Sequence, residues 1–226
     1  MEPTALVSSN ITAKTAACIG FWSRDERRKK QKPLILKAYQ ERISLRGLSR
    51  LFGIHRLTIA RWISEHVAAL PTLIATLLPA QPDDVLVFDE AWSFVRKRLN
   101  KRWLWTVMCR RTLQIVAFVI GDRSQQSCHR LWDMVPRTYR RCLSYSDFWK
   151  AYQEVLPKES HCAVGKGSGQ LSHMERWYCT LRQRQARYVR KTLSFSKSDV
   201  YHHIVTNWFI IDHNLAMNSL HSPLTL

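Results

Sequence analysis

The part of the chain after residue 84 alternates short apolar runs with polar or basic turns. Three runs of strand length come first, and helical stretches with two shorter apolar runs follow. Runs of this length bounded by turn residues are typical of strands, and the first three predict an antiparallel meander. The predicted strands cover 85–95, 101–111, 113–121, 141–148 and 161–165, and the predicted helices cover 124–137, 148–156 and the region from 171 onward.

This order of elements predicts the fold class. Three strands, a helix, a strand, a helix, a strand and a C-terminal helical region give an α/β domain with a mixed five-stranded sheet and flanking helices. The same order is that of the ribonuclease H-like fold. We therefore expect residues 85–226 to form one ribonuclease H-like domain, with its first strand in the centre of the sheet and its fourth strand beside the first.

Apolar residues at helical spacing over 33–68 predict three short helices ahead of that domain. Ser44 suits the cap of the second helix, and Gly53 stands where a tight turn needs a positive φ. The pattern is that of a small all-α helix-turn-helix, whose third helix enters the major groove of DNA. The DNA-binding candidates at the start and outer face of that helix are His55, Arg56, Thr58 and Arg61. A plain three-helix packing unit is the alternative.

The segments on either side of these helices lack a regular apolar period. Residues 1–32 end in a basic run and are expected to be an irregular basic segment, with Pro33 at the first position of the first helix. Residues 69–84 contain three prolines and end in two aspartates, so they are expected to link the helix-turn-helix to the following domain.

The amino-acid composition limits the kind of partner that the chain is expected to bind. The 226 residues hold 35 Lys and Arg against 17 Asp and Glu, a formal net charge of +18, and 46% of them are hydrophobic. That apolar content excludes a disordered basic tail, and the charge favours a polyanion, most simply nucleic acid. No run is long enough for a transmembrane helix, and the N-terminus lacks the apolar stretch of a signal peptide. We expect a cytoplasmic protein with reduced cysteines and no membrane contact.

Three of the acids in the predicted domain 85–226 occupy positions that this topology would bring together. Asp89 lies within the first strand, Asp147 ends the fourth strand, and Glu175 opens the last long helix. A carboxylate inside an apolar strand is costly unless something pairs with it, and divalent cations relieve the repulsion among converging carboxylates. Hard oxygen ligands select Mg²⁺ or Mn²⁺, and two such ions can activate an attacking oxygen and stabilise a leaving oxygen on a phosphodiester.

Each of these acids also has a purely structural interpretation. Asp147 could cap the helix that follows it, and Glu175 could be an ordinary acid at a helix N-terminus. Glu90 could replace Asp89 as the functional acid. Because neighbouring residues of a strand point to opposite faces, at most one of these two faces a shared site. Asp122, after the third strand, is interpreted as a turn residue.

Four stretches stand out in this order along the chain: FDEAWSFV, YSDFWKAY, MERWYCTLRQR and VRKTLSFSKS. Together they resemble the insertion-sequence-one family of bacterial DDE transposases, and the resemblance covers about residues 84–212. It implies a ribonuclease H-like catalytic domain whose Asp-Asp-Glu triad matches Asp89, Asp147 and Glu175, with Mg²⁺ or Mn²⁺ as cofactor and two ions expected. It also implies binding of terminal inverted repeats, strand cleavage, strand transfer into target DNA, and a homo-oligomer that joins two element ends.

Basic residues after the third acid fit contact with DNA. Between 176 and 197 the sequence holds seven positive residues and no acid. A solvated helix face normally carries mixed charges, so a single-signed run favours a nucleic-acid backbone. Arg182 lies two turns after Glu175 on the same helix face and is expected near the reacting phosphate. Arg187 and Arg190 are expected to follow the DNA backbone.

The sequence leaves two other functions possible, and it leaves the role of two tryptophans undecided. Members of the resembled family usually carry a Cys-rich zinc-ribbon segment before the helix-turn-helix, whereas only Cys18 stands there in this sequence. A truncated, catalytically inactive DNA-binding remnant or repressor of the element is therefore the alternative to an active transposase. A nuclease for RNA–DNA hybrids is a third hypothesis, which the basic helix-turn-helix disfavours. Most tryptophans are expected in the core, with Trp149 and Trp177 open to base stacking.

Overall fold

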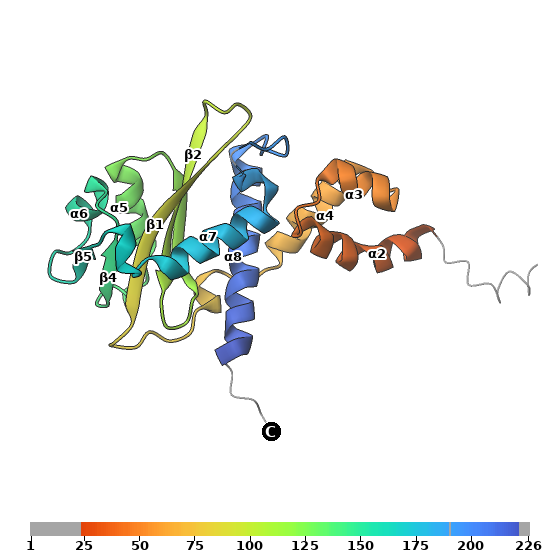
Figure 1. Cartoon of the computed structure of the whole chain (residues 1–226). Coiled ribbons are helices and arrows are strands. Elements are labelled where there is room, and N and C mark those ends of the chain that lie inside the picture. Colours follow the sequence, from red (N-terminus) through yellow and green to blue (C-terminus); the bar gives the residue numbers. More distant parts are fainter. Residues whose placement is uncertain (1–23, 190, 222–226) are drawn as a thin grey trace, which may run out of the picture.

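The computed structural model describes residues 24–189 and 191–221, and it holds three N-terminal helices followed by a mixed sheet with helices on both faces (Figure 1). The strands are β1 Val85–Phe94, β2 Lys101–Cys109, β3 Ile115–Gly121, β4 Leu143–Ser146 and β5 His161–Ala163. The helices are α2 Arg24–Tyr39, α3 Leu45–Phe52, α4 Arg56–Ala68, α5 Gln125–Met134, α6 Lys150–Val155, α7 Ser172–Arg184 and α8 Asp199–His221. Short 3₁₀ turns are η1 Ile74–Thr76, η2 Lys166–Ser168 and η3 Ala186–Tyr188.

The five strands lie in the order β3-β2-β1-β4-β5. The first three form an antiparallel meander, and β4 and β5 run parallel to β1. This is the ribonuclease H-like arrangement expected from the sequence, so the predicted fold class is confirmed. β1 lies in the centre of the sheet, between β2 and β4.

Alternate residues of β1 enter two separate cores. Leu86 and Phe88 pack with α5 and α6, whereas Val87 and Ala91 pack with α7 and α8. Successive side chains of a strand point to opposite faces, which gives this period of two. In Figure 1, α5 and α6 lie on one side of β1, and α7 and α8 lie on the other. One strand therefore presents neighbouring side chains to two different environments.

Local signals set the ends of the N-terminal helices. Ser44 Oγ accepts a hydrogen bond from the N–H of Gly47 at the start of α3 (3.0 Å). Gly53 follows α3 with a φ of 65°, in the left-handed region that favours glycine. Leu48 and Ile59 are fully buried between the helices. The three predicted helices are present with the predicted cap and turn.

The first of these helices begins earlier than predicted. α2 starts at Arg24, so the basic run ahead of Pro33 is helical rather than irregular, and Pro33 lies inside the helix instead of at its start. Arg, Lys, Glu and Gln are good helix formers, and they extend the helix through this run although the proline removes one backbone hydrogen bond. Residues 1–23, including Cys18, lie outside the described residues.

The N-terminal helices share a buried cluster with the C-terminal helix. Ile59 and Trp62 of α4 belong to the same cluster as Val205 and Trp208 of α8. Part of the segment expected as a linker also packs against α8. Thr76 of η1 is fully buried, and its Oγ1 accepts a hydrogen bond from Nδ2 of Asn214 in α8 (3.0 Å). Contacts with α8 thus hold the N-terminal helices against the sheet-containing region.

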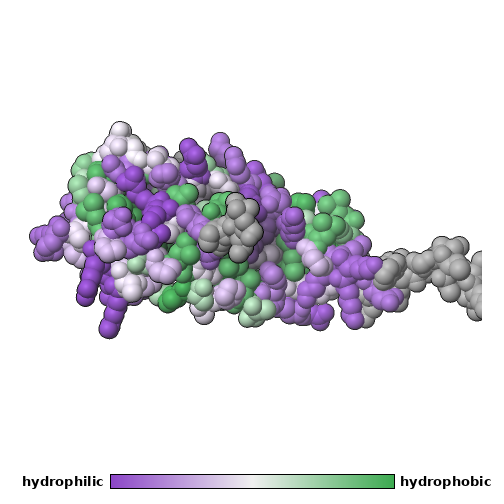
Figure 2. All heavy atoms as spheres, turned by 90° about the horizontal axis from the view of Figure 1, so that it is seen from below, coloured by the Kyte–Doolittle hydropathy of each residue, from purple (hydrophilic) through white to green (hydrophobic). Residues whose placement is uncertain are grey.

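Hydrophilic side chains cover most of the face seen in Figure 2, over both the sheet region and the N-terminal helices, and hydrophobic residues form separate patches between them. Among the described residues, no helix combines the length and the apolar character needed to cross a bilayer. The described cysteines are free thiols: Cys109, Cys128 and Cys142 are buried, and Cys162 and Cys179 are exposed.

Candidate active site

Strand pairing brings two of the predicted acids to the same level. β1 and β4 run parallel, with Val85 opposite Leu143 and Val87 opposite Tyr145. Continuing this register by two residues sets Asp147, directly after β4, beside Asp89. Neighbouring strands lie about 4.8 Å apart, so the two backbones approach closely at this point. The prediction that the fourth strand lies beside the first is confirmed.

Helix α7 presents the third acid to the same face of the sheet. Asp89 shares its face of β1 with Val87, which packs in one core with Met174 and Tyr178 of α7. Tyr178 Oη donates a hydrogen bond to the backbone carbonyl of Asp89 (2.9 Å). Glu175 is exposed and lies one helical turn before Tyr178. The hydroxyl contact therefore fixes the part of α7 that carries Glu175 against the part of β1 that carries Asp89.

The charged form of the Asp89 carboxyl has no cation in the described chain to offset it. Burial raises the pKa of this carboxyl to about 7, and the neighbouring charges of Glu90, Asp147 and Glu175 contribute to the rise. A hydrogen bond from the N–H of Glu90 to Asp89 Oδ1 (2.7 Å) acts in the opposite direction. Within the part of the chain that the structure describes, none of the three predicted acids forms an ion pair.

The three carboxylates do not form a finished ligand set by themselves. Among residues 24–189 and 191–221, no three His, Cys, Asp or Glu side chains are arranged to hold a metal ion. Like charges without a counter-ion repel one another, so the side chains would have to turn inward to share one. The donors nevertheless suit a divalent cation, because they are hard oxygens with a net negative charge and Asp89 is half-buried without a partner cation.

Glu90, the residue after Asp89, lies on the other face of β1, where its carboxylate has partners. Its carboxylate accepts hydrogen bonds from Arg123 Nη2 (2.6 Å) and Tyr152 Oη (2.7 Å). The Arg123 guanidinium also contacts two aromatic rings, with its Cζ 3.9 Å from the ring centre of Trp149 and 4.6 Å from that of Trp103. Burial raises the pKa of Glu90, and its two hydrogen-bond partners hold the rise back. Glu90 is therefore a buried acid with partners inside the chain.

Two further aspartates make local hydrogen bonds. Asp147 Oδ1 accepts a hydrogen bond from the N–H of Trp149 (2.9 Å), which occupies one carboxylate oxygen. Trp149 is itself the cap residue of α6 and no side chain caps this helix, so Asp147 does not have the capping role considered from the sequence. Asp122 Oδ1 accepts from the hydroxyls of Ser124 and Ser127 (both 2.6 Å), and these hydrogen bonds lower the pKa of Asp122. The turn interpretation of Asp122 agrees with these contacts.

Arg182 lies beside Tyr178, which contacts the strand that carries Asp89. Its Cζ is 5.7 Å from the ring centre of Tyr178, whose hydroxyl reaches the backbone of Asp89. The two aromatic candidates nearby differ from each other. Trp177 is buried against other aromatic rings, which makes it a core residue, and Trp149 is half-buried beside the guanidinium described above.

Arg187 does not lie where a contact with the DNA backbone requires it. Its side chain is buried and donates hydrogen bonds to Ser196 Oγ (2.7 Å) and to Tyr39 Oη (2.5 Å). It thereby ties the segment after α7 to α2, because a buried guanidinium needs acceptors and these hydroxyls supply them. The predicted role of Arg187 is corrected to this internal one. Arg190 lies outside the described residues.

The candidate DNA-reading side chains lie at the start and outer face of α4. His55, Arg56 and Arg61 are exposed, and Thr58 is half-buried. His55 Nδ1 accepts a hydrogen bond from the N–H of Leu57 (3.4 Å) and so caps the helix. Arg61 pairs with a glutamate one turn further along, at 3.4 Å. The surface position expected from the sequence is thus present for three of these four residues.

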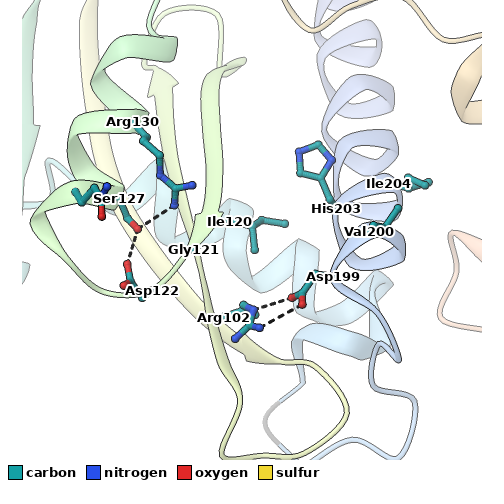
Figure 3. A pocket seen from close by; sticks show the side chains of 11 residues that line it. Arg102, Ile120, Gly121, Asp122, Ser127, Arg130, Asp199, Val200, His203 and Ile204 are labelled. Carbon is teal, nitrogen blue, oxygen red and sulfur yellow. Dashed lines mark hydrogen bonds and ion pairs between the residues drawn. The ribbon is translucent and has the colours of Figure 1, made fainter.

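A pocket of about 720 Å³ lies elsewhere, between β3, α5 and the start of α8 (Figure 3). Its charged and hydroxyl groups are partnered within the chain. Arg102 pairs with Asp199 (2.7 Å), and Arg130 donates to Ser127 Oγ (3.1 Å). None of the three predicted acids is among its lining residues. The pocket and the candidate active site are therefore separate features.

Sequence reasoning did not single out three side chains of this region. Tyr178 could have been found, because it lies three residues after Glu175 and so on the same helix face. Arg123 and Tyr152 contact Glu90 over separations of 33 and 62 residues. No local pattern reports such distant partners, so these two required the tertiary structure.

Comparison with known proteins points to one family. The sequence model of a family described as IS1 transposase matches residues 85–216, which contain all three acids. The chain is 34% identical over 125 residues to the insertion element iso-IS1n protein InsB of Shigella dysenteriae, covering 55% of this chain and 92% of that protein. It is 31% identical over 134 residues to the insertion element IS1 4 protein InsB of Escherichia coli K12, covering 58% of this chain and 78% of that protein.

Proposed function

The chain belongs to the IS1 transposase family, and on that basis we propose that it binds the terminal inverted repeats of an insertion element and catalyses metal-dependent strand cleavage and strand transfer. The observation that supports this most is the approach of Asp89 and Asp147 on adjacent strands, with Glu175 on the helix that covers the same face. The proposed partner is double-stranded DNA, at the element ends and at the target.

In this proposal the three acids hold divalent ions, Mg²⁺ or Mn²⁺, with two ions expected. Such ions, when bound, supply Lewis-acid polarisation of a phosphodiester. The chain prepares the site in two ways. Burial makes the charged form of Asp89 costly until a cation arrives, and the hydroxyl of Tyr178 holds the backbone of Asp89 in place. Asp147 is oriented by its hydrogen bond to the backbone ahead of α6.

The proposed reaction consists of two phosphoryl transfers. In the first, a water oxygen attacks the phosphorus at the element end, the bond to the 3′ oxygen breaks, and a free 3′ hydroxyl remains. In the second, that hydroxyl oxygen attacks a phosphorus of the target strand and displaces the target's own 3′ oxygen. Arg182 would offset charge that develops on the phosphate oxygens. Because two element ends are joined, at least a dimer is proposed.

The N-terminal helices are proposed to read the terminal repeats. The exposed start of α4 offers His55, Arg56 and Arg61, with Thr58 half-buried behind them. A recognition helix contacts base edges with residues near its N-terminus, which is where these side chains lie. We therefore propose α4 as the helix that enters the major groove.

Strand cleavage and joining on duplex DNA that carries the element's flanking repeats tests the proposal. The wild-type protein is expected to produce nicked and joined strands when Mg²⁺ is present, and Asp89→Asn is expected to produce neither. Asp133→Asn, which changes an exposed aspartate of α5, is the matched control and should keep activity. Tight binding of the ends without nicking by the wild type would instead indicate a DNA-binding protein that does not cut.

A further inference from the structure

Beyond the candidate active site, β1 and β2 continue into a hairpin whose tip is basic. Residues 96–101, in the sequence Arg-Lys-Arg-Leu-Asn-Lys, are all exposed. We call these six residues the basic tip. In Figure 1 the hairpin extends past the end of the neighbouring strands, at the end of the sheet towards which β1 runs.

The positive charges of the basic tip have few counter-charges. Within the described residues, Lys97, Arg98 and Lys101 form no ion pair. Some exposed cations on the helices are paired, as Lys150 is with Glu154 one turn away, whereas others such as Arg46 and Arg56 form no ion pair within the described residues. A cluster of cations without acids attracts a polyanion, and a DNA backbone is the polyanion that fits the proposed substrate.

Leu99 is the second unusual feature of the basic tip. Its side chain is 90% exposed, and it stands between Arg98 and Asn100 at the turn. A single exposed leucine is common on protein surfaces. At the end of a cationic hairpin, however, an apolar side chain is suited to reach a groove of the duplex whose phosphates the flanking cations contact.

The basic tip is braced from a distant part of the chain. The N–H of Arg96 donates to the carbonyl of Ser196 (2.8 Å), and the rings of Phe94 and Phe195 lie 5.5 Å apart. Arg96 Nε also donates to the carbonyl of Lys197, which adds another exposed cation beside the tip. The hairpin is therefore held in a defined direction by the segment that precedes α8.

Strand geometry gives the distance between the basic tip and the acids. Asp89 and Phe94 belong to one uninterrupted strand, and the tip follows within a few residues. At about 3.3 Å per residue the tip lies about 20 Å beyond Asp89, which corresponds to about six base pairs of duplex at 3.4 Å each. A duplex that passes the acids can therefore also reach the tip.

We infer that the basic tip is a DNA-contact surface separate from the N-terminal helices and from the acids. Lys97, Arg98 and Lys101 contact phosphates on both sides of a groove, and Leu99 packs into that groove. This inference rests on the proposed function in taking duplex DNA as the substrate. It does not depend on which residues cut the DNA.

The test measures binding of the full chain to a duplex of unrelated sequence, in a chelator, over a range of salt concentrations. The triple variant Lys97→Ala, Arg98→Ala, Lys101→Ala is expected to bind at least about tenfold more weakly. Its slope of log affinity against log salt should fall by about 2 to 3, since each lost phosphate contact contributes about 0.9. Leu99→Ala should weaken binding by about tenfold and leave the slope unchanged, because it removes apolar contact alone.

The matched control removes three exposed cations from the opposite end of the sheet, with Arg137→Ala, Arg141→Ala and Lys158→Ala. It has the same change in net charge and should keep the wild-type slope. Equal slopes for the two triple variants would overturn the inference. So would a basic-tip variant that binds DNA normally but loses self-association, because the surface would then serve a second copy of the chain. Absence of cleavage by the wild type would contradict the proposed function and leave these binding results valid.

Discussion

The two faces of β1 treat neighbouring carboxylates in opposite ways. Glu90 meets Arg123 and Tyr152 on the face covered by α5 and α6. Asp89, one residue earlier, lies on the face covered by α7 and is surrounded by further acids instead of cations. Both residues are half-buried, so the difference comes from the helices and not from the strand. The chain neutralises one acid itself and leaves the other to a charge from outside.

The largest effect on the difference between the two faces is expected from substituting the other two predicted acids, Asp147 and Glu175. Asp147→Asn and Glu175→Gln are each expected to lower the rate of strand cleavage by about 100-fold to 1,000-fold, the range for removing one electrostatic group from an active site. Glu90→Gln should stay within about tenfold of the wild type, because its partners are structural. Single-turnover cleavage of a labelled duplex measures all three. Equal losses for Glu90→Gln and Asp147→Asn would show that both faces take part in the chemistry.

On the face of β1 that carries Glu90, a substitution should instead lower the stability of the fold. Arg123→Met leaves the Glu90 carboxylate buried, with a side chain that is 2% exposed, and without its cation. The expected loss is about 3 kcal/mol in the free energy of unfolding, the low end for breaking a buried pair, since the Arg123 side chain is 35% exposed. Urea denaturation measures the change.

A double-mutant cycle sharpens this result. When Glu90→Gln and Arg123→Met are combined, the loss in unfolding free energy should be smaller than the sum of the two single losses, because the second change no longer strands a buried charge. Additive losses would mean that Arg123 stabilises the fold through its aromatic contacts alone.

A pH-dependent effect is expected further along the Asp89 face of β1. Ser93 Oγ lies 2.9 Å from Nε2 of His202, and the Nδ1 of this histidine lies 2.8 Å from Ser196 Oγ. Burial, with the charge of Arg187 as a further cause, lowers the pKa of His202 to about 3. The unfolded chain then binds a proton that the folded chain does not, so stability is complete above about pH 6.5 and falls as the pH drops towards 3.

The contribution of His202 amounts to at most about 1.4 kcal/mol per pH unit in that window. His202→Asn should flatten the dependence of unfolding free energy on pH between about 6.5 and 4 relative to the wild type. His129→Asn changes an exposed histidine of α5 and serves as the control. A wild-type slope retained in His202→Asn would contradict a neutral, buried imidazole at this position.

Much of the sheet could be predicted because its signals are local. The short apolar runs, the turns between them and the proline after the helix that ends at Val155 all act within a few residues. The boundary of α2 could not be predicted in the same way. A proline suits a helix start, yet the favourable helix formers ahead of Pro33 outweigh its cost inside the helix.

The candidate site likewise contains features that the sequence predicts and features that it does not. The positions of Asp89 and Asp147 follow from strand order and register, which the sequence indicates. The charge run after Glu175 suggested that its arginines all contact DNA. The structure separates them, since Arg182 lies beside the Tyr178 ring and Arg187 is buried against hydroxyls from two other segments. Sequence reports the charge of a side chain, whereas its burial depends on residues far along the chain.

Direct titration with Mn²⁺, followed by the electron paramagnetic resonance of the free ion, tests the gathering of the three acids most directly. The wild-type chain should bind Mn²⁺, and Asp89→Asn, Asp147→Asn and Glu175→Gln should each weaken binding by more than the 10-fold to 100-fold typical of an outer-sphere residue. Glu90→Gln and the control Asp133→Asn should bind as the wild type does. Equal Mn²⁺ affinity in the wild type and Asp89→Asn would contradict the account.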